Sequence, residues 1–534
     1  MTTEPEPTPP PEPEKKETKW VTYLAVILIA AFVLRYAYVL QIETPPFSDM
    51  ADYETMALNL LDGQGLVMNT PHMVYKAYRP PLYPLFIAAS YKLFGPEPET
   101  VRMTQVFLST LTVLFVFLMT REIIWGFNPE RKRNDQSKAA NGIALIAAAF
   151  FALEESSIFL VGQLLSETLF VFLLVLFAYL ILRGSRKPGL GVATLLGLLG
   201  GFLILTRPLS GPLFLFGVYW FFMRSRKYHA PPPKSWKEFS IFDSPYAPPI
   251  IMVVYAAVIV MCWGIRNQAV LGEFVPVSTN GGVNFYLGHH EGFGYHSFGR
   301  KEDIRRALRA QGIDDEVTES KIFTQAGLEF IHDHPGEDFR NAFKKLDYLY
   351  LEPADVSSLF QPWKWWSYLD SPYRPWPWET NDRELRFWPV KDEQGKPILP
   401  TYQRWFWQEG RVPLVFWGWP MIILTVFGFF VGMGRLRKLS FPFGLVFVYT
   451  LCLLFFFTNA RFRAPIIPFL YIFAAVGVGK FIWGLPEETG EPPKKEEEFP
   501  AEEGMKSDAP GTEPEETDYE SAPPGSNAEG SSPT

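Results

Sequence analysis

Two carboxylates and an arginine stand close together near the N-terminus. Asp49 and Asp52 are three residues apart, so on a helix their side chains share one face. Arg79 follows in the same polar stretch, directly before Pro80-Pro81, whose fixed backbone angles set where the arginine points. Paired carboxylates could move a proton, and a planar guanidinium could hold a phosphate through two hydrogen bonds. The acids equally suit the positive end of a helix dipole, so a purely structural role stays open.

A helix beginning at Asp49 would hold the two acids in place. Ser48 is a preferred residue type at the N-cap position, and the apolar residues Met56, Leu60 and Leu61 follow.

Composition places this helix in a membrane protein. The chain has 534 residues, of which 48% are hydrophobic and 16% aromatic. About 20 apolar residues cross a bilayer as a helix, and the apolar runs predict an all-α polytopic protein with ten spans. Cys262 and Cys452 fall in apolar runs, so we expect buried thiols and no disulfide framework. The predicted spans are 20–40, 101–123, 139–154, 165–183, 189–206, 208–223, 248–265, 412–433, 441–458 and 464–483.

Lysine and arginine residues set the orientation. With ten spans, the basic clusters near 131–138, 183–187, 224–237 and 435–438 all fall on the side of the N-terminus. The positive-inside rule therefore predicts that both termini are cytoplasmic and that the two acids face outward. The segment 82–94 is too short to cross and is apolar at helical spacing. We expect it, and a second piece at 158–164, to lie along the outer interface.

The spans divide the chain into membrane modules, an outer domain and two tails. The tails carry net charges of −2 and −12, so the body carries +6, from −8 + 12 + 2, which suits contact with anionic lipid or phosphate. We expect the tails to be disordered, because they are rich in Pro, Glu and Ser. The parts are the tails 1–19 and 486–534, the N-terminal module 20–265 with its first outer loop 41–100, a small mixed extracytoplasmic domain 266–411, helical over 301–350 with a break at Pro335, and the C-terminal helices of 412–485.

More charged residues stand at the outer ends of the spans. A single arginine at a helix end often only snorkels to the interface, but several there, against the positive-inside bias, favour a binding role. Glu154, Glu155 and Glu167 lie at or near outer ends too, although Glu167 could simply cap its own helix. The candidate arginines are Arg79, Arg102, Arg207, Arg461 and Arg463.

The outer domain opens with a Gly-rich, aromatic loop over 278–290. A metal site at His289, His290 and His296 is disfavoured, because adjacent histidines point apart in an extended segment and no nearby Cys completes a site. Residues 361–419 hold ten of the sixteen Trp, which suits either a sugar-stacking surface or an interfacial aromatic belt. The candidate substrate-binding residues are Glu167 and, in this loop, Asn280, Asn284, Tyr286 and His289.

Several motifs occur along the chain in a definite order. The first is D-x-x-x-Y-x-x-x-A-x-x-L-x-x-G-x-G, from Asp49 to Gly65, followed by RPPLYPLFIA from Arg79. The others are LLSETLF at 164–170, GGFLILTRP at 200–208, WGIRNQAVLGEFVPVSTNGGVNFYLG at 263–288 and ARFRAPIIPFL at 460–470. In order and spacing they resemble the bacterial protein-mannosyltransferase-like glycosyltransferases, GT-C fold enzymes related to family 39 and to the lipid A aminoarabinose transferases. The resemblance covers most of 20–483.

The resemblance implies a GT-C fold, a sugar donor on a polyprenyl phosphate, and an inverting transfer to an acceptor outside the cytoplasm. It places the general base on Asp49. Relatives often carry a second acid directly after it, where this chain has Met50, so Asp52 is the candidate helper. Arg79, Arg102 and the last-span arginines Arg461 and Arg463 match positions near the donor phosphate, and Tyr83 and Arg207 complete our candidate set for it.

A sugar on a lipid phosphate already has a good leaving group, so transfer needs a base near the acceptor hydroxyl and cations on the developing phosphate charge. A divalent metal could assist, but no pattern marks a metal site.

The expected location is the bacterial inner membrane, with a glycan, lipid or protein as acceptor and no nucleic-acid partner. The alternative is a transporter or flippase of lipid-linked sugars, which would use the same arginines without an acid; a third reading is a non-catalytic scaffold whose acidic tails recruit partners. Neither the sugar nor the oligomeric state is specified.

Overall fold

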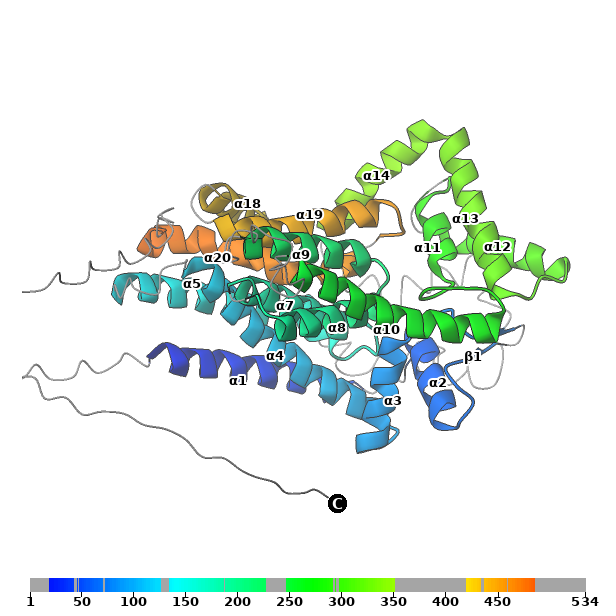
Figure 1. Cartoon of the computed structure of the whole chain (residues 1–534), viewed down its shortest axis with the longest axis horizontal. Helices are drawn as coiled ribbons and strands as arrows, with labels where there is room; N and C mark the ends of the chain where they lie inside the picture. The colour runs from blue at the N-terminus through cyan, green and yellow to red at the C-terminus, as the bar shows by residue number, and fades with distance from the viewer. Residues whose placement is uncertain are drawn as a thin grey trace, which may run out of the picture. The chain divides into compact units, whose positions relative to one another are not determined.

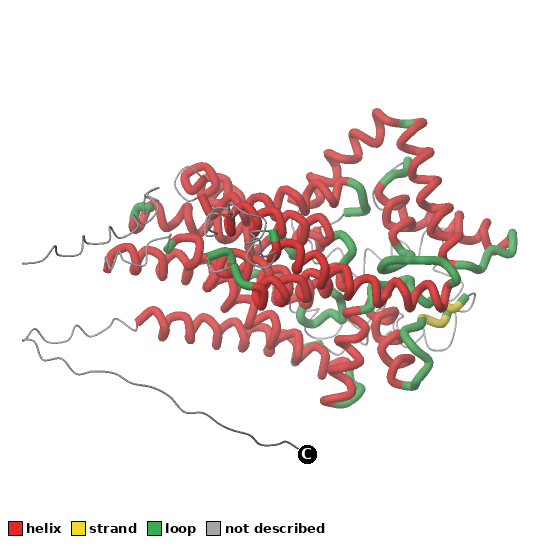
Figure 2. Tube along the Cα trace, in the orientation of Figure 1, coloured by secondary structure: helices red, strands yellow, loops and turns green. Residues whose placement is uncertain are grey.

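The computed structural model describes residues 19–42, 46, 48–70, 73–125, 134–186, 188–226, 246–291, 293, 297–350, 419–433, 437–458 and 460–485. The regular secondary structure of this part of the chain is helical except for one short ribbon, in which β1 (Met68–Asn69) pairs antiparallel with β2 (Val74–Tyr75) (Figure 2). The predicted class, an all-α polytopic membrane protein, is confirmed.

Each of the ten predicted spans contains a helix. By length and apolar composition α1, α4, α7 and α10 can cross a membrane, and α5, α8, α18, α19 and α20 are shorter apolar helices. These bundle helices are α1 (Lys19–Val39), α4 (Pro98–Ile124), α5 (Asn134–Ala152), α7 (Glu167–Gly184), α8 (Leu190–Thr206), α9 (Ser210–Ser225), α10 (Ala247–Leu271), α18 (Trp419–Met433), α19 (Ser440–Leu454) and α20 (Ile467–Trp483).

Close helix contacts hold the bundle together. α4 packs against α1, α5 and α7, α8 against α10, and α18 against α20. At Gly428 of α18 an added Cβ would meet the backbone carbonyl of Phe473 in α20, so only glycine allows this approach. Both cysteines are free, but neither is fully buried as predicted: Cys452 is partly exposed, and Cys262 is exposed because most of α10 is turned away from the bundle.

The remaining helices lie at one end of the bundle, which we call the loop end (Figure 1). The predicted interfacial segment 82–94 is helix α3 at the predicted bounds, and the short α6 begins three residues before the second predicted piece. In the described part of the domain 266–411, the regular secondary structure is helical. The loop-end helices are α2 (Asp49–Leu61), α3 (Leu82–Phe94), α11 (Gly281–Gly288), α12 (Ser297–Ala310), α13 (Glu316–Asp333) and α14 (Pro335–Tyr350); α6 (Glu155–Leu160) connects α5 to α7.

Local residue types explain where the domain helices begin. Pro335 opens α14, as predicted. A second break precedes α13, where Gly312 has a φ of 73° and the Asp315 carboxylate accepts hydrogen bonds from the first backbone N–H groups of the helix. The Trp-rich segment, apart from Trp419 at the start of α18, lies outside the described residues, as do both tails except Lys19, which opens α1.

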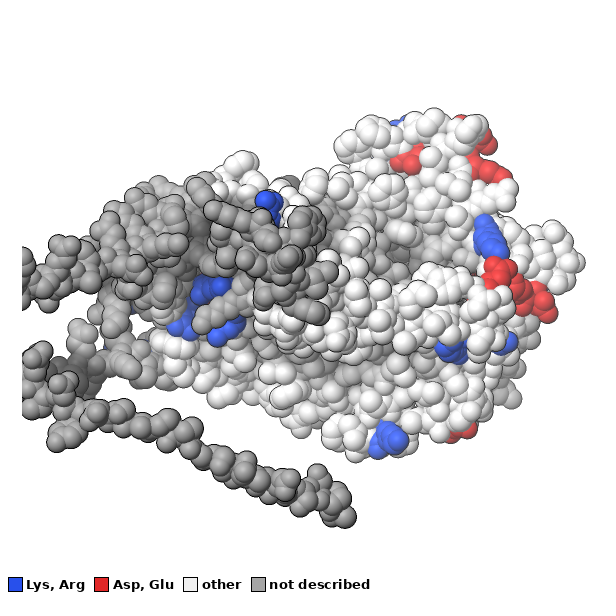
Figure 3. Space-filling view, in the orientation of Figure 1, with Lys and Arg blue, Asp and Glu red and all other residues white. Residues whose placement is uncertain are grey.

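On the face shown in Figure 3, where grey atoms do not cover it, charged side chains lie toward the two ends of the molecule. At the end opposite the loop end, Glu122 pairs with Lys438 at 3.1 Å and with Arg186 at 2.5 Å. Lys438 and Arg186 come from two of the predicted basic clusters, so these clusters and the Asp49 site lie at opposite ends of the bundle.

Candidate active site

Helix α2 places Asp49 and Asp52 together in its first turn, as predicted. The buried side chains of Met50 and Tyr53 anchor the helix. Ser48 occupies the N-cap position, but its side chain makes no capping hydrogen bond. Its φ of 51° lies in the left-handed region, which costs a non-glycine residue about 1–3 kcal/mol. A strained residue therefore stands directly before Asp49.

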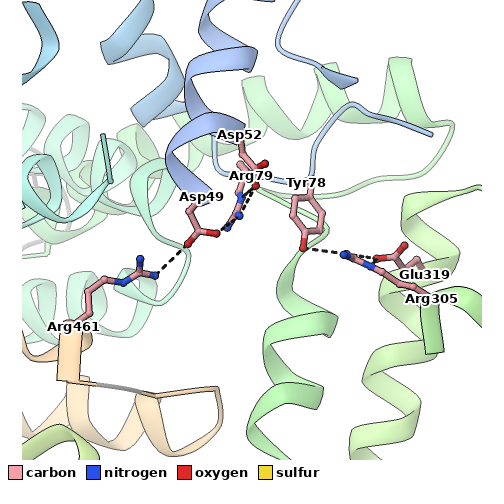
Figure 4. Close-up of polar contacts among 7 residues, drawn as sticks. All are labelled: Asp49, Asp52, Tyr78, Arg79, Arg305, Glu319 and Arg461. Atoms are coloured by element: carbon pink, nitrogen blue, oxygen red, sulfur yellow. Dashed lines mark hydrogen bonds and ion pairs between the residues drawn. The ribbon is translucent and has the colours of Figure 1, made fainter. Parts of the chain in front are cut away.

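Arg79 lies between the two acids (Figure 4). Its Nη2 is 2.6 Å from Asp49 Oδ1 and 2.6 Å from Asp52 Oδ2, and its Nε also donates to Asp52 Oδ2 at 3.3 Å. Its guanidinium lies over the rings of Tyr53 and Tyr78, with the carbon 5.4 and 5.2 Å from the ring centres. One arginine thus fixes the separation of both carboxylates.

Arg461 reaches the same site from the C-terminal part of the chain. Its Nη2 donates to Asp49 Oδ2 at 3.3 Å, and its Nε lies 2.9 Å from Glu167 Oε1. It belongs to a short 3₁₀ helix, η8 (Ala460–Arg463), in which three residues complete a turn. Residues two apart therefore point to different sides, and Arg463 faces away from the acids.

Arg207 extends the charge series beyond Glu167. Its Nη2 lies 2.7 Å from Glu167 Oε1, and Glu167 is only 1% exposed. Because Pro208 disfavours the helical conformation in the residue before it, Arg207 is extended, with φ −148° and ψ 113°, and α8 ends there. Glu167, the first residue of α7, is therefore part of a buried ion-pair network and does more than cap its helix.

Six side chains form a continuous series of alternating charge. Three arginines and three carboxylates give it no net charge. The series brings together five segments that are far apart in the sequence. Its order is Asp52, Arg79, Asp49, Arg461, Glu167, Arg207.

The pKa values of the two aspartates are pushed apart. Burial acts to raise the pKa of Asp49, but Arg79 and Arg461 outweigh it and hold that pKa well below its usual range. Burial raises the pKa of Asp52, and the charge of Asp49 adds to this effect, against the opposing pull of Arg79. Asp49 therefore keeps its charge to lower pH than Asp52 does, a separation typical of carboxylates that share one site.

Three further candidates lie outside the charge series and make other contacts. Arg102 is 2% exposed and donates to the Gly162 carbonyl at 3.1 Å and to Glu99 at 2.8 Å. Arg463 is fully buried and donates to the Leu349 carbonyl at 3.3 Å, near the end of α14. Tyr83 is buried edge-on against Tyr53, and its hydroxyl donates to Gln105 at 3.0 Å.

The candidates in the 278–290 loop lie in and around α11. Asn280 Oδ1 accepts from Ser278 at 3.0 Å, and the Asn284 carbonyl accepts from the backbone of Phe457 at 3.0 Å. Tyr286 is buried against Phe323 of α13. These contacts join the domain to the bundle and to α13.

His289 is buried beside α14. Its Nδ1 lies 2.6 Å from Asp338 Oδ1, and burial, helped by Lys345, lowers the pKa of the imidazole. Among the described residues no group of three or more His, Cys, Asp or Glu side chains is arranged to hold a metal ion, and His296 falls outside them.

One buried arginine and one group of polar residues were not predicted from the sequence. Arg35 lies fully buried in α1 and donates to Ser109 and Ser157, both at 2.8 Å. It shares the bundle interior with Glu154, which accepts from Tyr471. A charged residue inside an apolar helix is the signal that could have marked Arg35. The group around Glu316 and Arg305 has no such signal because it lies on polar helices.

Fold and site together define a helical multi-pass membrane protein with a network of ionised side chains at its loop end. No known protein family matches the chain, and no curated protein is similar to it in sequence. ArnT from Cupriavidus metallidurans bound to undecaprenyl phosphate is similar in structure, with 14% identity, a TM-score of 0.35, and coverage of 87% of this chain and 78% of that one. The apo form of the same protein has 12% identity and a TM-score of 0.32, and the match covers 86% of this chain and 77% of that one. An oligosaccharyltransferase from Archaeoglobus fulgidus, in complex with zinc and sulfate, has 13% identity and a TM-score of 0.29, and the match covers 71% of this chain and 58% of that one.

Proposed function

We propose that this protein is a membrane glycosyltransferase that moves a sugar from a polyprenyl phosphate to an acceptor hydroxyl, with inversion, and that Asp49 is the general base. The observation that carries the proposal is the position of Asp49, a carboxylate held by two arginines at once. Arg79 and Arg461 bind its two oxygens at 2.6 and 3.3 Å. The motif resemblance to GT-C glycosyltransferases implies the same donor class and the same base.

The reaction uses these groups as follows. The acceptor oxygen attacks the anomeric carbon while Asp49 takes the hydroxyl proton. The bond from that carbon to the phosphate oxygen breaks, and its electron pair stays on the phosphate, which changes from a singly charged diester to a doubly charged monoester. Arg79 and Arg461 stabilise this added charge. A single displacement from the opposite face inverts the anomeric centre.

Donor binding would also activate the base. While both arginines hold Asp49, its low pKa makes it a poor proton acceptor. A donor phosphate competes for the same two guanidinium groups. As they turn toward the phosphate, Asp49 loses the cations that stabilise its ionised form, and its basicity rises. Asp52 keeps a contact to Arg79 during this exchange, which is the helper role we propose for it.

A transporter or flippase of lipid-linked sugars is the second candidate. Buried ionisable groups within the helical bundle, Arg35 and Glu154, favour it, because transporters carry such groups. The cavity beside Glu154, however, is about 20 Å³, which is room for about one water molecule. A cavity of that size does not hold a sugar. The carboxylate and the arginines that transfer needs lie together at the loop end, so transfer is the better supported function.

The test is Asp49→Asn, assayed with undecaprenyl phosphate carrying a hexose or a pentose. Loss of the base should lower turnover by about 10²–10⁴-fold, while undecaprenyl phosphate still binds. Asp62→Asn, at the exposed other end of α2, is the matched control and should keep full activity. Normal turnover in Asp49→Asn would remove it as the base. Sugar movement across vesicles that survives Asp49→Asn would favour the flippase.

A further inference from the structure

The segment that leads into Arg79 is held from the far side by helix α13. Glu316 Oε1 accepts hydrogen bonds from the backbone N–H groups of Lys76 at 2.7 Å and of Ala77 at 3.1 Å. Its other oxygen accepts from the Thr279 hydroxyl at 2.7 Å. One buried carboxylate therefore binds two consecutive amides just before Arg79.

The carbonyl groups of the same two residues are bound as well. The Lys76 carbonyl accepts from Arg266 Nη1 at 2.6 Å, and the Ala77 carbonyl accepts from the Thr279 N–H at 2.9 Å. All four backbone polar groups of this dipeptide thus have partners, drawn from α10, from the loop before α11 and from α13. A backbone segment bound on every side has little freedom to shift.

The side chains next to Arg79 lead to α13 and α12 too (Figure 4). Arg305 donates to the Tyr78 hydroxyl at 3.2 Å and pairs with Glu319 at 2.7 Å, and the Tyr78 ring lies against Arg79. Tyr75 also donates to Glu319, at 3.2 Å. Two hydrogen bonds and one cation–π contact therefore connect Glu319 of α13, through Arg305 and Tyr78, to the arginine between Asp49 and Asp52.

Burying these charges needs a reason. Glu316 and Glu319 are each 5% exposed, and Arg305 is 8% exposed. Buried charges are costly unless they are paired, and apolar residues of similar volume would often stabilise a fold equally well. The specific geometry that they impose on residues 75–79 is the feature that an apolar contact could not supply.

We propose that Glu316, supported by the Arg305–Glu319 pair, is a positioning residue for Arg79. Pro80 and Pro81 stiffen the backbone after Arg79, and Glu316 fixes the backbone before it. Together they hold Nη2 at 2.6 Å from both Asp49 and Asp52. The proposal rests on the function of Arg79 as a donor-phosphate ligand, since positioning matters to the reaction only if Arg79 binds the donor.

The test combines hydrogen exchange with donor binding in the full-length protein in lipid nanodiscs. Glu316→Ala should make the amides of Lys76 and Ala77, within the segment 75–79, exchange roughly tenfold to a hundredfold faster, because these two amides lose charge-assisted hydrogen bonds. It should weaken binding of undecaprenyl phosphate roughly tenfold, with a smaller effect on turnover at saturating donor. Glu316→Gln keeps an oxygen acceptor for the two amides and should restore most of the protection and affinity.

Asp315→Ala is the matched control. This neighbouring side chain caps the same helix, accepting from Val317 and Thr318, but it is exposed and binds no group of residues 75–79 in the structure. Asp315→Ala should weaken α13 locally. It should leave the hydrogen exchange of residues 75–79 and the affinity for undecaprenyl phosphate at wild-type values.

Two results would overturn the proposal, and they differ in meaning. Unchanged exchange over 75–79 in Glu316→Ala would show that Glu316 does not fix this segment, whatever Arg79 does. Faster exchange with unchanged affinity for undecaprenyl phosphate would show that the position of Arg79 does not matter to the donor, which would refute the proposed role of Arg79 itself. If Glu316→Ala and Asp315→Ala lost protection over 75–79 and donor affinity to the same extent, the effect would come from the stability of α13 alone. That result would also overturn the proposal.

Discussion

Neutralising Glu167 while keeping its shape is a sharp test of the alternating charge series. In Glu167→Gln the series keeps three arginines but only two carboxylates. Glu167 is 1% exposed and lies 2.7 Å from Arg207 and 2.9 Å from Arg461. Removing one partner of a buried ion pair typically costs about 3–5 kcal/mol. We therefore expect the variant to lose about 3 kcal/mol of stability without ligand.

The same change should strengthen donor binding, because a phosphate supplies the missing negative charge. A phosphate about 5 Å from Arg461 would interact with it by about 3 kcal/mol at an effective dielectric constant of about 20. Recovering roughly half of that corresponds to about tenfold tighter binding. Undecaprenyl phosphate should therefore raise the melting temperature of Glu167→Gln more than that of the wild type.

Thermal unfolding with and without undecaprenyl phosphate gives the stability, and native mass spectrometry gives the affinity. Glu273→Gln is the control, because Glu273 forms an ion pair with Lys321 in which the two side chains are 51% and 62% exposed. An exposed pair contributes about 1 kcal/mol or less, so neither quantity should change much. Wild-type stability together with wild-type affinity in Glu167→Gln would refute the charge reasoning.

Three further predictions follow from individual contacts. Arg461→Ala should weaken binding of undecaprenyl phosphate at least about tenfold, whereas Arg463→Ala should lower the melting temperature and leave that affinity unchanged; equal affinity losses would contradict the assignment. Burial raises the pKa of Asp52, so as pH falls Asp52 takes up a proton before Asp49 does. This protonation favours the folded state at low pH, and its contribution to stability is lost as pH rises through the raised pKa. Asp52→Asn should therefore move the acid limb of the pH profile of kcat/KM to lower pH. An unmoved limb would show that protonation of Asp52 does not set it. Gly428→Ala should reduce the yield of folded protein in membranes, because its Cβ would collide with the backbone of α20; a normal yield would show that the two helices can separate.

The fold was largely predictable because its signals are local. Apolar runs of span length marked all ten bundle helices, and the short amphipathic run at 82–94 gave α3 at its observed bounds. Where the bounds differ, proline chemistry explains one case. The span predicted from 464 begins as a helix only at Ile467, and Pro468, which has no backbone N–H to donate, suits the first turn of that helix.

The site was only partly predictable because it is made by tertiary convergence. Position in the chain marked five arginines at span ends, but only packing decides that Arg79, Arg207 and Arg461 meet. Arg102 and Arg463 sit at similar places in the sequence and turn to backbone carbonyls instead. A 3₁₀ turn separates the two last arginines, and no propensity in the sequence shows which of them faces Asp49.

The contacts before Arg79 show the same limit more strongly. Glu316 lies about 240 residues away in the chain and binds backbone amides rather than a complementary side chain. A carboxylate that pairs with main-chain groups has no partner residue type to search for. Such contacts become visible only when the backbone path is known.

The central claim is that the alternating charge series is the donor-phosphate site, and a structure of the protein with undecaprenyl phosphate bound tests it most directly. We predict that the phosphate oxygens lie about 3 Å from the guanidinium groups of Arg79 and Arg461, and that Asp49 is released from at least one of them. A phosphate bound instead at Arg102 or Arg463, with Arg79 and Arg461 still paired to Asp49, would contradict the claim.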